Sequence, residues 1–165
     1  MKKIGAFIGK FYPPHIGHLS VIDDAINFFD LVYVIVSYNK NRNKTIQKEQ
    51  NFEDLSPFLI KKWFEEYYKS NSKVKVEVFD ETGLLPYPND QDKWAERFKK
   101  QFPDVNYKIA DGGYREFNEK YFSGYGFYEI DREKIPVHST MLRGDISKNI
   151  DFLIPTAREY FLKQK

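Results

Sequence analysis

Two histidines, two glycines and a lysine lie within ten consecutive residues, Gly9 to His18 (GKFYPPHIGH). The segment follows the first apolar run and precedes a helical pattern, so we expect it at a strand-to-helix turn. Such a turn in an α/β protein can hold a nucleotide phosphate against backbone N–H groups and a helix N-terminus. Histidine occurs three times in 165 residues. Two histidines so close together therefore mark a candidate phosphate site.

The alternatives for this segment are a proline-rich turn, a Walker-type phosphate loop and a zinc site. A Pro-rich turn whose histidines merely cap the next helix stays open, because Pro and Gly are common in turns. A Walker-type phosphate loop fails, because the spacing from Gly5 to Lys10 is one residue short and Phe11 replaces the required Ser or Thr. A zinc site needs three or four ligands, yet the only other histidine is His138 and the chain has no cysteine. The spacing of His15 and His18 instead predicts that both imidazoles share one face of a first helical turn. The helix dipole, the exposed N–H groups and one or two imidazolium ions would together favour a polyphosphate there.

A second polar group, Ser139-Thr140-x-x-Arg143, lies at an expected helix start. Its hydroxyls and N–H groups could hold phosphate oxygens, and Arg143 could neutralise them with two parallel hydrogen bonds. An ordinary Ser/Thr cap beside a solvated arginine would give the same pattern.

A third group combines Pro86-Tyr87-Pro88 with Trp94. A tryptophan beside a rigid loop can stack on a flat cationic ring. The alternative is that Trp94 belongs to a core stripe with Phe98 and Phe102, which its helical spacing favours.

The remaining pattern predicts the elements that position these groups. Apolar, β-branched runs indicate strands at residues 3–8, 31–37, 74–78, 105–110 and 127–131. Helical periodicity or helix starts indicate helices at 17–29, 52–70, 90–102 and 114–122, and after Ser139 and Pro155. The Asn- and Lys-rich stretch 39–51 is expected to be a polar loop. This alternation predicts an α/β fold with a mostly parallel sheet, helices on both faces, and one domain over residues 1–165.

The composition narrows the function classes. A formal net charge of +2 gives no electrostatic case for nucleic acid or membrane binding. The lack of cysteine excludes disulfides. No signal peptide and no membrane-spanning run is visible, so the expected compartment is the cytoplasm. The 12 Tyr and 15 Phe support a substantial core and leave a homo-oligomer open.

These residues together resemble the nucleotidyltransferases that carry an H-x-G-H motif. The resemblance is greatest to nicotinamide mononucleotide adenylyltransferases, in the form of the adenylyltransferase half of bacterial proteins that also carry a ribosylnicotinamide kinase. It rests on GKFYPPHIGH, GLLPYPNDQDKW at 83–94, VHSTMLR at 137–143 and the ending IDFLIPTAREYF. The first block specifies the superfamily, and the Pro-Tyr-Pro…Trp block indicates the nicotinamide branch.

The chain also departs from that family. His138 and Ser139 stand where the family usually has Ser and Gly, and Lys61-Lys62 lie where it commonly has an arginine. The turn ADGGY at 110–114 differs as well, and no Walker motif of a kinase half is present.

The resemblance implies a Rossmann-like nucleotidyltransferase fold and transfer of the adenylyl group of ATP to nicotinamide mononucleotide, giving NAD and pyrophosphate. The acceptor phosphate is already ionised, so cations and positioning are expected to suffice. Other acceptors, such as phosphopantetheine or an alcohol phosphate, and a catalytically silent nucleotide-sensing domain are the alternatives.

The implied roles are assigned residue by residue. His18 would contact the α-phosphate, His15 and Arg143 the β- and γ-phosphates, and Lys10 would bridge the two reacting phosphates. Mg²⁺ would arrive on ATP and keep most of its waters, with no protein ligand cage. The further expected contacts are, for ATP, Gly9, Phe11, Tyr12, Gly17, Ser139 and Thr140, and, for the nicotinamide ring, Trp94 with Tyr87 nearby.

Overall fold

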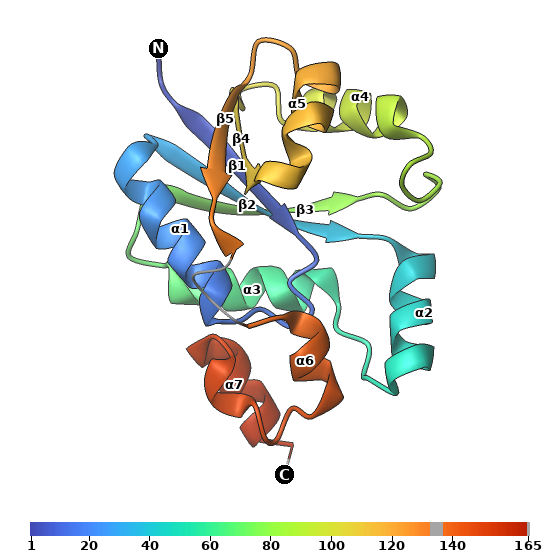
Figure 1. Ribbon diagram of the computed structural model, residues 1–165. Helices are drawn as coiled ribbons and strands as arrows, with labels where there is room; N and C mark the ends of the chain where they lie inside the picture. Colours follow the sequence, from blue (N-terminus) through green and yellow to red (C-terminus); the bar gives the residue numbers. More distant parts are fainter. Residues whose placement is uncertain (133–136, 165) are drawn as a thin grey trace.

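The computed structural model describes residues 1–132 and 137–164 (Figure 1). Its centre is a five-stranded sheet in the order β3-β2-β1-β4-β5, and every neighbouring pair is parallel. The strands are β1 (Ile4–Gly9), β2 (Leu31–Tyr38), β3 (Val74–Asp80), β4 (Tyr107–Asp111) and β5 (Gly126–Ile130). This confirms the expected α/β fold with a parallel sheet. The single-domain interpretation stays a prediction.

Helices cover both faces of the sheet, as predicted. Figure 1 shows α1 (Ile16–Phe28), α3 (Pro57–Tyr67) and α7 (Pro155–Leu162) on one side of the sheet, and α4 (Gln91–Gln101) and α5 (Arg115–Tyr121) on the other. The remaining helical segments are α2 (Lys40–Gln50), η1 (Gly112–Tyr114), α6 (Ser139–Gly144) and η3 (Ile150–Phe152).

The two faces of the sheet have different cores. The α1/α3/α7 side contains mainly aliphatic sheet residues such as Val32, Val34 and Val76. The α4/α5 side is aromatic and is built around Phe79, Phe98 and Phe122. Side chains on a strand alternate between the two faces, so consecutive residues of the β2 run feed both cores. Because both faces are covered, this strand is apolar almost throughout.

The prediction of a polar loop at 39–51 is wrong, since most of the segment forms α2. Asn39 caps this helix, with its side-chain oxygen accepting from the N–H groups of Asn41 and Arg42 at 3.1 and 3.2 Å. Asn43 is buried on the inward side of this helix, and Ile46, Gln47 and Gln50 are half-buried. The buried face is therefore largely polar, and hydrophobic periodicity cannot detect it.

The helix expected at 52–70 is shorter than predicted. It begins at Pro57 because the Ser56 hydroxyl accepts from the N–H of Phe58 at 3.2 Å, and proline suits a first helical turn. Phe58 itself is 68% exposed, and the buried stripe is formed by Ile60, Trp63 and Phe64.

The carboxyl ends of the parallel strands all lie at one edge of the sheet, where α/β proteins bind their ligands. The loops after β1, β2 and β3 meet there, together with α6 (Figure 1). In the described part of the chain, no helix has both the length and the apolar character needed to cross a membrane.

Candidate active site

His15 and His18 form a reciprocal cap at the start of α1. The N–H of Gly17 donates to Nδ1 of His15 at 3.1 Å, and the N–H of His15 donates to Nδ1 of His18 at 3.0 Å. The two rings stack, with centroids 3.6 Å apart. The shared first turn is thus confirmed, and so is a capping role for both histidines. The amide of Gly17, expected to contact ATP, is occupied by His15.

The prediction that His15 or His18 carries a positive charge is wrong for the protein without ligand. Burial, reinforced by the charges of His138 and Arg132, lowers the pKa of His15 from 6.5 to about 4. Burial, reinforced by His15 and Arg132, lowers the pKa of His18 well below its usual range. Both rings are therefore neutral near pH 7. Because each Nδ1 accepts a hydrogen bond, the ring proton is on Nε2, where it can be donated.

The loop that follows β1 is held tightly against the core. Phe11 has a left-handed backbone with φ of 50°, and its ring packs edge-on against His18 with centroids 4.7 Å apart. The ring also folds back over Gly9, where an added Cβ would lie 3.0 Å from it. The Tyr12 hydroxyl donates to the carbonyl of Glu53 at 2.7 Å. This packing fixes the path of the backbone between β1 and α1.

Lys10 is the one cation of this loop. Its Nζ donates to Oδ1 of Asn43 at 3.4 Å. Burial lowers the pKa of Lys10 to about 8; nearby Glu81 opposes the shift, and Arg42 and Arg143 add to it. Three cations therefore lie within electrostatic reach of one another, a surplus of positive charge that an anion would relieve.

The structure joins the Ser139–Arg143 block to the first loop. Arg143 donates from Nη1 to the carbonyl of Tyr12 at 2.6 Å, and from Nη2 to the Thr140 hydroxyl at 3.3 Å. The Ser139 hydroxyl donates to the carbonyl of Pro13 at 3.1 Å, so its proton is used within the protein. The two blocks that the sequence singled out thus form one site.

Helix α2 supplies three site residues that the sequence reasoning missed: Arg42, Asn43 and Gln50. Asn43 contacts Lys10, and the Gln50 side chain accepts a hydrogen bond from Nε of Arg143. The sequence feature that could have revealed them is the seven-residue spacing from Asn43 to Gln50, which places both side chains on one face of a helix.

Glu81, directly after β3, is a fourth missed residue. Its carboxylate accepts from the indole N–H of Trp94 at 2.9 Å and acts electrostatically on Lys10. Trp94 is half-buried and stacks on Phe98 with centroids 5.5 Å apart, so it does belong to the aromatic stripe of α4. Tyr87 is 80% exposed. The nicotinamide contacts of Trp94 and Tyr87 stay predictions.

The donor set does not suit a resident magnesium site. Among residues 1–132 and 137–164, there is no group of three or more His, Asp or Glu side chains that could hold a metal ion. The cations Lys10, Arg42 and Arg143 would also repel one.

Comparisons with known proteins identify relatives of this chain. A family model described as cytidylyltransferase-like matches residues 6–56, which span β1, the histidine pair, β2 and α2. A phosphopantetheine adenylyltransferase from Christiangramia forsetii is 35% identical over 122 residues, covering 67% of this chain and 72% of the relative. The chain belongs to the cytidylyltransferase-like family.

Two further matches are to NadR proteins. The trifunctional NAD biosynthesis/regulator protein NadR of Escherichia coli K12 is 28% identical over 100 residues, covering 60% of this chain but only 24% of NadR. A crystal structure of NadR protein in complex with NR superposes with a TM-score of 0.77 at 24% identity, covering 97% of this chain and 45% of that one. The chain thus spans about a quarter of its NadR relative, and the structural match shows the fold.

Proposed function

We propose that the chain transfers the adenylyl group of ATP to nicotinamide mononucleotide, producing NAD and pyrophosphate. The observation that carries the proposal is the meeting of two phosphate-type blocks at the carboxyl edge of the sheet, where Arg143 bonds the carbonyl of Tyr12. Three cations and two Nε2–H donors converge there. This combination suits a polyphosphate whose charge must be stabilised during transfer.

The chain's own residues supply positioning and charge. The Nε2–H of His18 would donate to an α-phosphate oxygen and strengthen that bond as charge develops. Lys10 would lie between the acceptor phosphate and the transferred phosphate. The acceptor phosphate is already ionised at neutral pH, so the neutral histidines need not remove a proton from it.

The remaining ATP contacts follow from the same geometry. His15, Arg143 and Arg42 would bind the outer phosphates, and Thr140 would donate to a phosphate oxygen once Arg143 turns toward the ligand. Gly9 permits the close backbone path from which the N–H groups of Phe11 and Tyr12 would contact ATP. Ser139 would act indirectly, by fixing α6 against Pro13.

The nicotinamide assignment depends on the surroundings of Trp94. Its indole N–H bonds Glu81, and Glu81 acts on Lys10, so the aromatic ring and the reacting phosphates would lie on either side of one carboxylate. A carboxylate beside a tryptophan suits a cationic pyridinium ring, which gains from both the aromatic face and the negative charge. The similarity to NadR, a NAD biosynthesis/regulator protein, supports an acceptor that leads to NAD.

Phosphopantetheine is the second candidate acceptor, because the Christiangramia forsetii relative is a phosphopantetheine adenylyltransferase. The experiment is to incubate the protein with MgATP and, separately, nicotinamide mononucleotide, nicotinic acid mononucleotide, phosphopantetheine or glycerol phosphate, and to measure pyrophosphate release. We expect release with nicotinamide mononucleotide. Release only with phosphopantetheine would transfer the assignment to that acceptor, and binding of ATP without release would support a sensing domain.

A further inference from the structure

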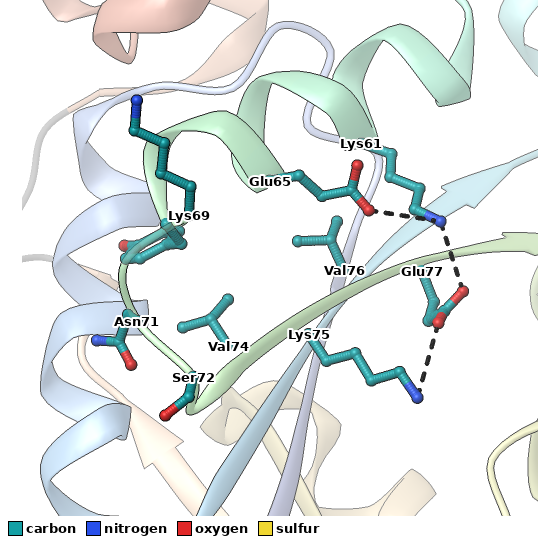
Figure 2. A pocket seen from close by; sticks show the side chains of 10 residues that line it. Lys61, Glu65, Lys69, Asn71, Ser72, Val74, Lys75, Val76 and Glu77 are labelled. Atoms are coloured by element: carbon teal, nitrogen blue, oxygen red, sulfur yellow. Dashed lines mark ion pairs between the residues drawn. The ribbon is translucent and has the colours of Figure 1, made fainter.

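Strand β3 forms one edge of the sheet and carries alternating charges. Its sequence, VKVEVFD, places Lys75 and Glu77 on either side of Val76. Figure 2 shows Glu77 paired with Lys61 of α3 and with Lys75, at N–O distances of 3.8 and 4.0 Å. A groove of about 360 Å³ lies beside this edge, between the end of α3 and β3.

The hydrogen bonds of β3 identify which residues face outward. The N–H of Val32 donates to the carbonyl of Lys73 at 2.8 Å, and the N–H of Glu81 donates to the carbonyl of Tyr38 at 2.7 Å. Along a parallel strand, every second residue directs both its N–H and its C=O group to the same neighbouring strand. Since Lys73 and Glu81 bond β2, the odd-numbered residues of β3 do so too. The even-numbered residues 74, 76, 78 and 80 therefore turn their N–H and C=O groups toward the edge.

Several of these outward groups already have partners. The N–H of Val74 donates to the carbonyl of Asn71 at 3.2 Å, and the carbonyl of Val78 accepts from the Gln101 side chain at 2.9 Å. The carbonyl of Asp80 accepts from Arg97 at 3.1 Å. Over residues 74–78, and counting partners only within the described ranges, the unmatched groups are the Val74 carbonyl, both groups of Val76 and the Val78 N–H.

These four groups match an antiparallel copy of the same strand. With Val76 opposite Val76 of the second copy, each Val76 N–H meets the other Val76 carbonyl, and each Val78 N–H meets a Val74 carbonyl. The same register places the Val74 N–H opposite the Val78 carbonyl of the other copy, and both of these groups are already bonded within their own chain. Every backbone group from 74 to 78 is then satisfied.

The charges favour the same register. Lys75 of one copy lies directly opposite Glu77 of the other, twice over, in a pair type whose side chains approach closely. Moving the two-fold axis by one residue in either direction would place Lys75 opposite Lys75, or Glu77 opposite Glu77. Both alternatives are repulsive, and each would also direct a free group at one already bonded.

We propose that two copies of this chain associate through β3, antiparallel and centred on Val76, to form one continuous sheet. The Lys61 and Lys75 side chains move aside as the strands pair, because Val76 is only 5% exposed in the single chain. The candidate active site lies at the carboxyl end of the sheet, so this interface leaves it open. The opposing interpretation is that Lys75 and Glu77 protect a monomer's edge, as charged residues commonly do.

Charge variants distinguish these interpretations when studied by sedimentation velocity. The wild-type protein should have twice the chain mass of 19.7 kDa at micromolar concentration. Lys75→Glu alone, or Glu77→Lys alone, places like charges opposite each other and should weaken the dimer by about tenfold or more. A one-to-one mixture of the two variants pairs opposite charges again, so it should form a heterodimer although each variant alone is monomeric.

A wild-type protein that is still monomeric at about 100 µM would overturn the proposal, because mass action favours a dimer as the concentration rises. So would two variants that dimerise as tightly as the wild type, or a mixture that dimerises no better than each variant alone. Circular dichroism and pyrophosphate release check that the variants fold. If they do not, amide hydrogen exchange of the wild-type protein provides the test: the Val76 and Val78 amides should be protected at high concentration and lose that protection on dilution, and protection independent of concentration contradicts the dimer.

Discussion

The imidazole of His15 stacks on that of His18 at an interplanar angle of 23°, and each ring binds a backbone N–H at the start of α1. The pair therefore replaces the usual capping box of Ser or Thr with Glu or Gln. It caps the first turn with two neutral rings, each of which uses Nδ1 for the cap and carries its proton on Nε2. One pair of side chains would thus combine helix capping with the proposed anion recognition.

The first prediction concerns acid stability. The pKa of both histidines is lower in the folded protein than the ordinary 6.5, and that of His15 is about 4. The unfolded chain therefore binds more protons between these values, and the free energy of unfolding should fall as the pH drops from about 6.5 to 4. The slope should reach about 1.4 kcal/mol per pH unit for each histidine.

Urea unfolding across this pH range measures the effect. The double variant His15→Asn/His18→Gln keeps an acceptor at both cap positions but does not titrate, so its stability should change much less. If the unfolding free energy of the double variant falls equally steeply with decreasing pH, the acid sensitivity comes from other groups.

The second prediction separates catalysis by His18 from its capping role. His18→Ala should lower kcat by about 10²-fold or more, while the KM for ATP changes less, because the His18 contact strengthens in the transition state. His18→Gln should preserve the cap and the unfolding free energy yet still lose turnover. Equal losses in kcat and in ATP affinity would reduce His18 to a ground-state contact.

The third prediction concerns Trp94. The chain has two tryptophans, and Trp63 is buried on the opposite side of the sheet. Trp63→Phe leaves Trp94 as the sole indole, whose fluorescence nicotinamide mononucleotide should quench on binding, since the rings stack. Trp94→Ala should raise the KM for nicotinamide mononucleotide at least about tenfold and leave that for ATP nearly unchanged. If nicotinamide mononucleotide binds without quenching the Trp94 fluorescence, Trp94 is only a core residue.

The fourth prediction concerns Lys108, which β4 directs into the aromatic core. Its Nζ lies 4.1 Å from the centre of the Phe98 ring and 4.5 Å from that of Phe122, and burial lowers the pKa of Lys108 to about 7. The unfolded chain binds this proton more tightly, so stability should rise as the pH increases above 7. Lys108→Met should raise the unfolding free energy by about 1–3 kcal/mol at pH 7.

The advantage of the Lys108→Met protein should shrink as the pH rises toward about 9, where ordinary tyrosines are still mostly neutral. Thermal unfolding of both proteins at matched pH values provides the measurement. A variant less stable than the wild type at pH 7 would show that the ring contacts outweigh the cost of burying the ammonium group.

The sequence predicted best those features that depend on local spacing. The shared turn of His15 and His18 and the α6 helix starting at Ser139 follow from short-range geometry. Helix α2 could not be predicted from hydrophobic periodicity, because its inward face carries Asn43 and Gln50 and its stability comes from capping and site contacts. The neutrality of the histidines was also missed, since it depends on burial and on charges brought close only by the fold.

The most direct test of adenylyl transfer is to follow the α-phosphorus of ATP. The protein is incubated with MgATP labelled at the α-phosphate and with nicotinamide mononucleotide, and the products are separated by chromatography. The account predicts that the label appears in NAD, with unlabelled pyrophosphate released in equal amount and both lost in the His18→Ala protein. Label that remains in ATP or appears in AMP, with no labelled NAD, would contradict it.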